Sequence, residues 1–314
     1  MDLACALDAV SLPVELSDGI IDYLADDRSS LRTTSLVCRA WCPRSRSHLF
    51  HTVHVKAVRK SFRSFLAFLN HNDQRPQCSP PISRLIRCLH LYGSRRCDYR
   101  PQDGADEVVS TITSTFLVDL FAALPGLKEL SLEAIQFDTR LYPAARLLAD
   151  ELPNFKLDFL SMKNVWTVAP AGDDFTHVLS MFSTIGTLRI VTPFWPTFPV
   201  QPIEVAVVPP IPHTQPCFPG TLTVTRIESC ARMFTPYLLS LMRRTASVAS
   251  VREVDVACRS LVDVEALGNF FELAGPTLDH VTVDLVELFS RNQIRKCMLG
   301  FHRARQTDSL NPRL

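Results

Sequence analysis

The sequence predicts an α/β fold, in which a short module of three helices precedes a solenoid of alternating strands and helices. Two observations support this prediction. Apolar residues recur at helical spacing near the N-terminus, and later a strand pattern, apolar-x-x-apolar-x-apolar, returns at intervals of roughly 27 to 30 residues. Repeated strand-helix units give parallel strands with crossovers on one side, and units that contact only their neighbours build a solenoid.

The first helix is expected to begin at Pro13, because proline has no N–H group to leave unpaired at the first helical position. Glu15 places a carboxylate in the electropositive first turn. An apolar stripe then follows helical spacing and consists of Leu12, Leu16, Ile20, Ile21, Tyr23 and Leu24. Gly19 weakens this helix.

A second helix is expected after Asp27, with Ser29 or Ser30 as its N-terminal cap and Pro43 at its end. Its apolar residues are Leu31, Leu36, Val37, Cys38 and Trp41. A third segment, Ser45 to Phe50, precedes an alternating stretch, His51 to Val55, that predicts a strand. Three helices this short cannot bury such broad apolar faces on one another, so the leftover apolar surface indicates a binding partner.

Four segments of this module match a known family in order and spacing. They are Leu12-Pro13-x-Glu15-Leu16, Ile20-Ile21-x-x-Leu24, Ser35-Leu36-Val37-Cys38-Arg39-x-Trp41 and His48-Leu49-Phe50. The stretch resembles an F-box, most closely those of filamentous and mushroom-forming fungi. The resemblance implies docking onto the Skp-type adaptor of a cullin-RING ubiquitin ligase. It assigns this contact to Leu12, Pro13, Glu15, Leu16, Ile20, Ile21, Leu24, Leu36, Val37, Cys38 and Trp41.

The strand pattern occurs in seven places after the module. The clear copies begin at Leu127, Leu157, Ile185, Val251 and Leu278, and weaker ones lie at Ile86 and around Leu222. Segments with helical apolar faces separate them, such as the one formed by Leu267, Phe270, Phe271 and Ala274. This array resembles an irregular leucine-rich-repeat domain, a common companion of an F-box. We therefore expect an F-box at 10–55, a helical linker at 56–82 and a leucine-rich-repeat-like solenoid at 83–314.

One stretch interrupts the repeats. Residues 193–219 contain too many prolines for a helix or a central strand, so a long inserted loop is expected there. Because exposed aromatic residues often anchor protein interfaces, we expect Phe194, Trp195 and Phe198 to contact a target protein. A ligand for a proline-binding domain is the alternative interpretation of this stretch.

Composition limits the class of protein. Hydrophobic residues make up 46% and charged residues 21% of the 314 residues, which is typical of a folded globular chain. The net charge of +1 gives no overall attraction to nucleic acid or an acidic membrane. Ten scattered cysteines indicate reduced thiols, and neither a signal peptide nor a membrane span is evident. These features favour the cytoplasm or the nucleus.

Chemistry-bearing motifs are few. The sequence has no phosphate-binding glycine motif and no hydrolase motif, so we expect neither enzymatic activity nor a cofactor. A zinc site built from Cys38, Cys42, His48 and His51 has a spacing that fits no common finger, so no metal is expected. The basic residues Lys56, Arg59, Lys60 and Arg63 allow a nucleic-acid patch as a minor alternative.

Together these observations predict the substrate-recognition subunit of an SCF-type ubiquitin ligase. Its F-box would bind the Skp-type adaptor and, through it, a cullin, and its repeats would bind a target protein. An F-box scaffold that acts without ubiquitination is the main alternative, and a nucleic-acid-binding repeat protein is a weaker one.

Overall fold

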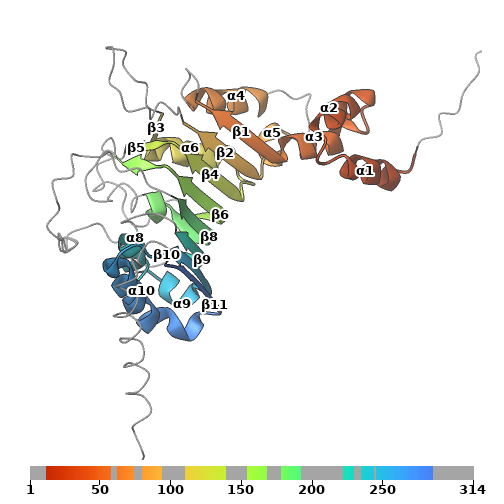
Figure 1. Cartoon of the computed structure of the whole chain (residues 1–314). Coiled ribbons are helices and arrows are strands. Elements are labelled where there is room, and N and C mark those ends of the chain that lie inside the picture. The colour runs from red at the N-terminus through yellow and green to blue at the C-terminus, as the bar shows by residue number, and fades with distance from the viewer. Residues whose placement is uncertain are drawn as a thin grey trace, which may run out of the picture.

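The computed structural model describes residues 12–57, 62–73, 80–93, 110–138, 154–167, 178–191, 222–229, 235–243 and 245–285. They form an N-terminal group of three helices beside one large sheet with helices packed against it (Figure 1). The Pro-rich stretch 193–219, with Phe194, Trp195 and Phe198, lies outside the described residues. Within these described ranges, no helix is both long and apolar enough to cross a membrane.

The main sheet has eight strands, all parallel, whose spatial order is also their order along the chain. They are β1 (Thr52–Lys56), β2 (Cys88–Tyr92), β4 (Glu129–Glu133), β6 (Phe155–Lys163), β8 (Phe182–Val191), β9 (Thr223–Ser229), β10 (Glu253–Ala257) and β11 (His280–Asp284). Every copy of the expected pattern thus contributes a strand, which confirms the α/β class and the parallel pairing.

The register of the strands explains why the pattern recurs. Leu130 of β4 lies opposite Leu89 of β2 on one side and Leu160 of β6 on the other, and Leu160 lies opposite Leu188 of β8. All four side chains are fully buried. Since successive side chains of a strand point to opposite faces, the residues between the apolar ones form a second, polar face of the sheet.

The apolar face is covered by helices. The longer ones are α4 (Arg63–Asp73), α6 (Ser114–Ala123), α8 (Thr235–Met242) and α10 (Leu261–Ala274). Leu69, Leu120, Leu238 and Phe270 of these helices are fully buried in the same core as the strands. Shorter segments, α5 (Ile82–Leu85), α9 (Ser247–Ser250) and the 3-10 helix η3 (Gly275–Thr277), come just before β2, β10 and β11.

A second, three-stranded parallel sheet was not predicted from the sequence. Its strands are β3 (Thr111–Thr113), β5 (Gln136–Asp138) and β7 (Trp166–Thr167). β5 and β7 follow β4 and β6 after matching turns, in which Ala134 and Asn164 have positive φ angles of 54° and 51°. Strands of two or three residues are too short to show an alternating apolar pattern, so the sequence gives no signal for them.

The expected leucine-rich-repeat-like solenoid is not shown by the structure, and this part of the prediction needs correction. The connections between strands are not copies of one unit: α4 and α5 precede β2, β3 and α6 precede β4, and α10 and η3 precede β11. Helical spacing in the sequence also predicts a helical face of Phe175, Val178, Leu179 and Phe182, and this prediction is wrong at Phe182, which begins β8. Any sheet with one buried face produces the same alternating strands, so the pattern predicted the strands but not the segments between them.

Candidate functional site

The N-terminal module consists of α1 (Val14–Tyr23), α2 (Arg28–Val37) and α3 (Cys42–His51). Pro13 precedes α1, and its carbonyl oxygen accepts hydrogen bonds from the N–H groups of Leu16 and Ser17, each at 3.1 Å. Proline fits here because the first turn of a helix has unpaired N–H groups in any case. The helix thus begins at Val14, one residue later than expected, and Pro13 is its N-cap residue.

The boundaries of α2 differ from the prediction. Asp27, rather than Ser29 or Ser30, caps the helix, because one of its carboxylate oxygens accepts the N–H groups of both serines at 3.0 and 3.1 Å. The serine hydroxyls also donate to this carboxylate and, with the N–H groups, hold the pKa of Asp27 far below its usual range. The helix ends at Val37, and Pro43 lies in the first turn of α3 instead of ending α2.

Asp22 joins the end of α1 to α3. Its carboxylate accepts two hydrogen bonds from Arg44, both at 2.6 Å, and lies 2.7 Å from Nε2 of His48. The hydrogen bond from Arg44, followed by that from His48, lowers the pKa of Asp22 to about 2. This paired carboxylate fixes the orientation of α1 relative to α3.

The stability of the module is expected to depend on pH through Asp22. Since the pKa of Asp22 is lower in the folded than in the unfolded chain, its stabilisation is present above pH 3.8 and is lost as the pH falls through about 2. Asp22→Asn should therefore lower the melting temperature slightly, by roughly 1–3 °C at neutral pH, and by clearly less at pH 2. Calorimetric scans across this range provide the measurement.

Arg44→Gln is the matched control for this pH effect. It removes the same ion pair from the other side, so it should flatten the pH profile to a similar extent, and the double variant should add little. Additive effects of the two substitutions would contradict a coupling between Asp22 and Arg44.

The module leaves most of its apolar surface uncovered. Ile21 and Leu31 are fully buried and form its small internal core. The large apolar side chains that remain exposed, which we call the apolar face, are Leu12, Val14, Leu16, Ile20, Tyr23, Leu36 and Val37. Leu36 is 85% and Tyr23 is 91% exposed, values unusual for such side chains in a monomer. Seven exposed large apolar side chains in so small a module favour an interaction site.

The structure distributes the predicted adaptor-binding residues over three environments. Eight are exposed: Leu12, Pro13, Glu15, Leu16, Ile20, Leu36, Val37 and Cys38. Leu24 and Trp41 are half-buried, and Ile21 lies in the internal core of the module. Trp41 is the N-cap residue of α3 and not part of α2. Val14 and Tyr23 were not assigned to the contact, although Tyr23 continues the helical stripe of Leu16 and Ile20.

The polar face of the main sheet is a second candidate surface. At its β1 end the rings of His54 and His90 stack with centroids 4.5 Å apart, and Tyr92 stacks 5.9 Å from His54. Burial, together with the charge of His54, lowers the pKa of His90, which favours its neutral form. This end of the face therefore presents stacked aromatic rings.

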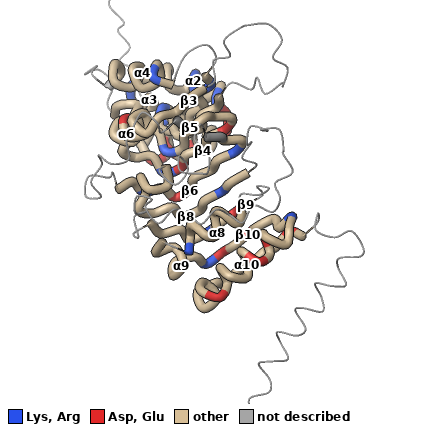
Figure 2. Tube along the Cα trace, turned by 90° about the vertical axis from the view of Figure 1, so that its left-hand side faces the viewer, with Lys and Arg blue, Asp and Glu red and all other residues tan. Residues whose placement is uncertain are grey.

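Ion pairs cover the middle of the polar face. Lys163 contacts Glu133 at 3.1 Å, and Arg226 contacts both Glu228 at 2.9 Å and Glu253 at 2.8 Å. Figure 2 likewise shows Lys and Arg interspersed with Asp and Glu among the described residues, rather than gathered in one stripe. Charges that are already paired attract phosphates weakly, so this face is better suited to another protein than to nucleic acid.

The described cysteines are free thiols in different environments. Cys38 is exposed, whereas Cys88 and Cys258 are buried. Burial raises the pKa of the Cys88 thiol, and burial, followed by the nearby Asp263, raises the pKa of Cys258 to about 11. Within the part of the chain that the structure describes, no group of His, Cys, Asp or Glu is arranged to hold a metal ion.

A comparison of the chain with models of protein families finds no match, and a comparison with curated proteins finds none either.

Proposed function

We propose that this chain is the substrate-recognition subunit of a cullin-RING ubiquitin ligase of the SCF type. Its N-terminal module binds the Skp-type adaptor, and the rest of the chain binds a target protein. The observation that supports this proposal most is the apolar face, because the F-box-like residues on α1 and α2 are exposed where a folded domain would bury them. A second protein can cover them. The resemblance to the F-box implies that this protein is the Skp-type adaptor.

The link between the module and the sheet also fits this role. α3 ends at His51 and β1 begins at Thr52, with no loop between them. Arg28 of α2 donates a hydrogen bond to the Thr52 carbonyl oxygen at 3.3 Å, and the N–H group of Arg87 donates to the carbonyl of His51 at 2.9 Å. A receptor needs such a stiff link, because holding a target at a fixed distance raises the effective concentration of its lysines near the ubiquitin donor. On this proposal the chain only binds its partners, and other subunits of the ligase carry out the transfer of ubiquitin.

Affinity purification of the tagged full-length chain, with and without proteasome inhibition, tests the proposal. We expect the adaptor and a cullin under both conditions, and ubiquitin-modified target proteins that accumulate when the proteasome is blocked. A variant with Leu12 and Pro13 replaced by Ala should lose the adaptor and keep the targets.

Two results would count against the ligase function. Absence of the adaptor from the purified wild-type complex would refute the role of the module. Presence of the adaptor without any target that accumulates on proteasome inhibition would favour the non-degradative scaffold instead.

A further inference from the structure

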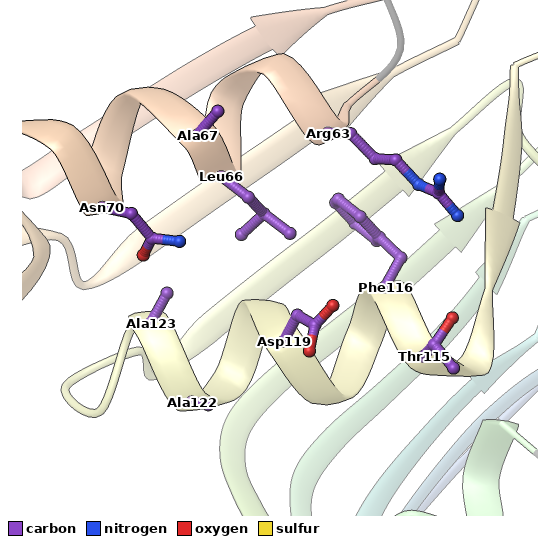
Figure 3. A pocket seen from close by; sticks show the side chains of 9 residues that line it. All are labelled: Arg63, Leu66, Ala67, Asn70, Thr115, Phe116, Asp119, Ala122 and Ala123. Atoms are coloured by element: carbon purple, nitrogen blue, oxygen red, sulfur yellow. The ribbon is translucent and has the colours of Figure 1, made fainter.

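A cleft lies between α4 and α6, on the side of the sheet that the helices cover (Figure 3). Its volume is about 680 Å³, which is within the usual range of ligand sites. Each helix contributes one stripe of residues at helical spacing: Arg63, Leu66 and Asn70 from α4, and Thr115, Asp119 and Ala122 from α6. Because both helices precede neighbouring parallel strands, their stripes run alongside each other.

Small residues keep the cleft open. Leu66 and Phe116 form its floor and are buried, at 8% and 5% exposure. The rims carry the alanines Ala67, Ala122 and Ala123, whose short side chains leave space above the floor. The cleft therefore offers an apolar floor that is wide enough for one or more side chains of a ligand.

Four polar side chains line the cleft: Arg63, Asn70, Thr115 and Asp119. Figure 3 shows Arg63 at one end, Asn70 at the other, and the carboxylate of Asp119 between them. No ion pair joins Arg63 or Asp119 to any other described residue. Among the described residues, the cleft thus presents one cation and one anion without an ion-pair partner, together with an amide that can both donate and accept hydrogen bonds.

We propose that this cleft binds a short peptide segment of a partner protein. An apolar side chain of the peptide lies on the Leu66–Phe116 floor, a basic side chain pairs with Asp119, and an acidic side chain pairs with Arg63. The side-chain amide of Asn70 forms hydrogen bonds with the main chain of the peptide, because both the side-chain amide and the main-chain amides contain one donor group and one acceptor group. The central carboxylate of Asp119 repels phosphates, so a nucleic acid does not fit the same site.

This inference goes beyond the proposed function. Peptide binding at the cleft does not depend on the adaptor, because α4 and α6 lie outside the N-terminal module. The further step, that the bound peptide belongs to a protein marked for ubiquitination, rests on the proposed function. Binding to the cleft and binding to the adaptor are therefore measured separately.

The test uses the full-length chain and an array of short synthetic peptides. Each peptide has a central leucine flanked by one lysine and one glutamate at varied spacing, and the comparison peptides have glutamine at both charged positions. We expect a subset of the charged peptides to bind roughly tenfold more tightly than their glutamine counterparts. If no charged peptide binds better than its counterpart, the proposal is wrong.

Variants of exposed residues locate the binding. Asp119→Ala should remove the part of the roughly tenfold preference that comes from the lysine of the peptide, and Ala122→Trp should fill the cleft and abolish binding. Glu265→Ala, which changes an exposed acid on α10, is the matched control and should bind like the wild type. All variants should keep the circular dichroism spectrum and adaptor binding of the wild type. Peptide binding that survives both cleft variants would overturn the assignment to this site.

Discussion

Replacing both Leu16 and Leu36 with aspartate is expected to weaken binding of the Skp-type adaptor at least a hundredfold. Both side chains are exposed in the free chain, at 58% and 85%, so the substitutions remove nothing from its core. In the complex each leucine would bury its apolar surface, worth about 1.5–3 kcal/mol, and an aspartate there would need to be desolvated. A hundredfold loss corresponds to about 2.7 kcal/mol, which these two terms exceed. Titration calorimetry with purified adaptor measures the change.

Exposed leucines elsewhere on the chain provide the control for this prediction. Leu261 and Leu273 of α10 are 59% and 48% exposed, and they lie far along the chain from the module. Aspartate at both positions introduces the same charge into surfaces of similar exposure. Adaptor affinity should not change. Equal affinities of the two double variants would show that the apolar face does not bind the adaptor.

The strands of the main sheet could be predicted from the sequence because a buried face imposes a period of two on each of them. Leu130, Leu160 and Leu188 recur in the chain because they lie opposite one another in space. Their connections could not be predicted in the same way. A helix, a short strand or a turn can each cover the apolar face, so the strand pattern does not restrict the choice to one repeating unit.

The module could be predicted as three helices, but not the positions of its caps. Asp27, Ser29 and Ser30 are all acceptable N-cap residues, and only the folded geometry shows that the carboxylate accepts both N–H groups. The solvent exposure of individual side chains in the module could not be predicted from the sequence either. Ile20 and Ile21 are adjacent and chemically identical, yet one is on the apolar face and the other is fully buried.

The cleft between α4 and α6 had no signal in the sequence at all. Arg63 and Asp119 are distant along the chain, and they share a cleft because β2 and β4 pair in parallel and align the helices before them. In the sequence analysis Arg63 was one of several basic residues with a possible nucleic-acid role. In the structure its neighbour across the cleft is an acid, which changes the kind of ligand that it suits.

Gly93→Ala is expected to destabilise the fold by about 3 kcal/mol or more. A Cβ atom at position 93 would lie 1.7 Å from the carbonyl oxygen of Ala134 and 2.7 Å from its carbonyl carbon. Neither side of this contact can move away freely. The N–H group of Gly93 donates to the carbonyl oxygen of Glu133 at 2.8 Å. The N–H group of Ala134 donates to the carbonyl oxygen of Lys163 at 3.0 Å. Thermal unfolding should show a melting temperature lower by roughly 5–10 °C.

Gly268→Ala is the matched control, because it makes the same chemical change where there is room for it. Gly268 is exposed within α10, and a Cβ atom there has no neighbour within 4 Å. Alanine loses less backbone freedom than glycine on helix formation, so this variant should be more stable by about 0.5–1 kcal/mol. The two glycine variants should thus shift the melting temperature in opposite directions. A Gly93→Ala variant as stable as the wild type would mean that the turns after β2 and β4 do not pack as closely as described.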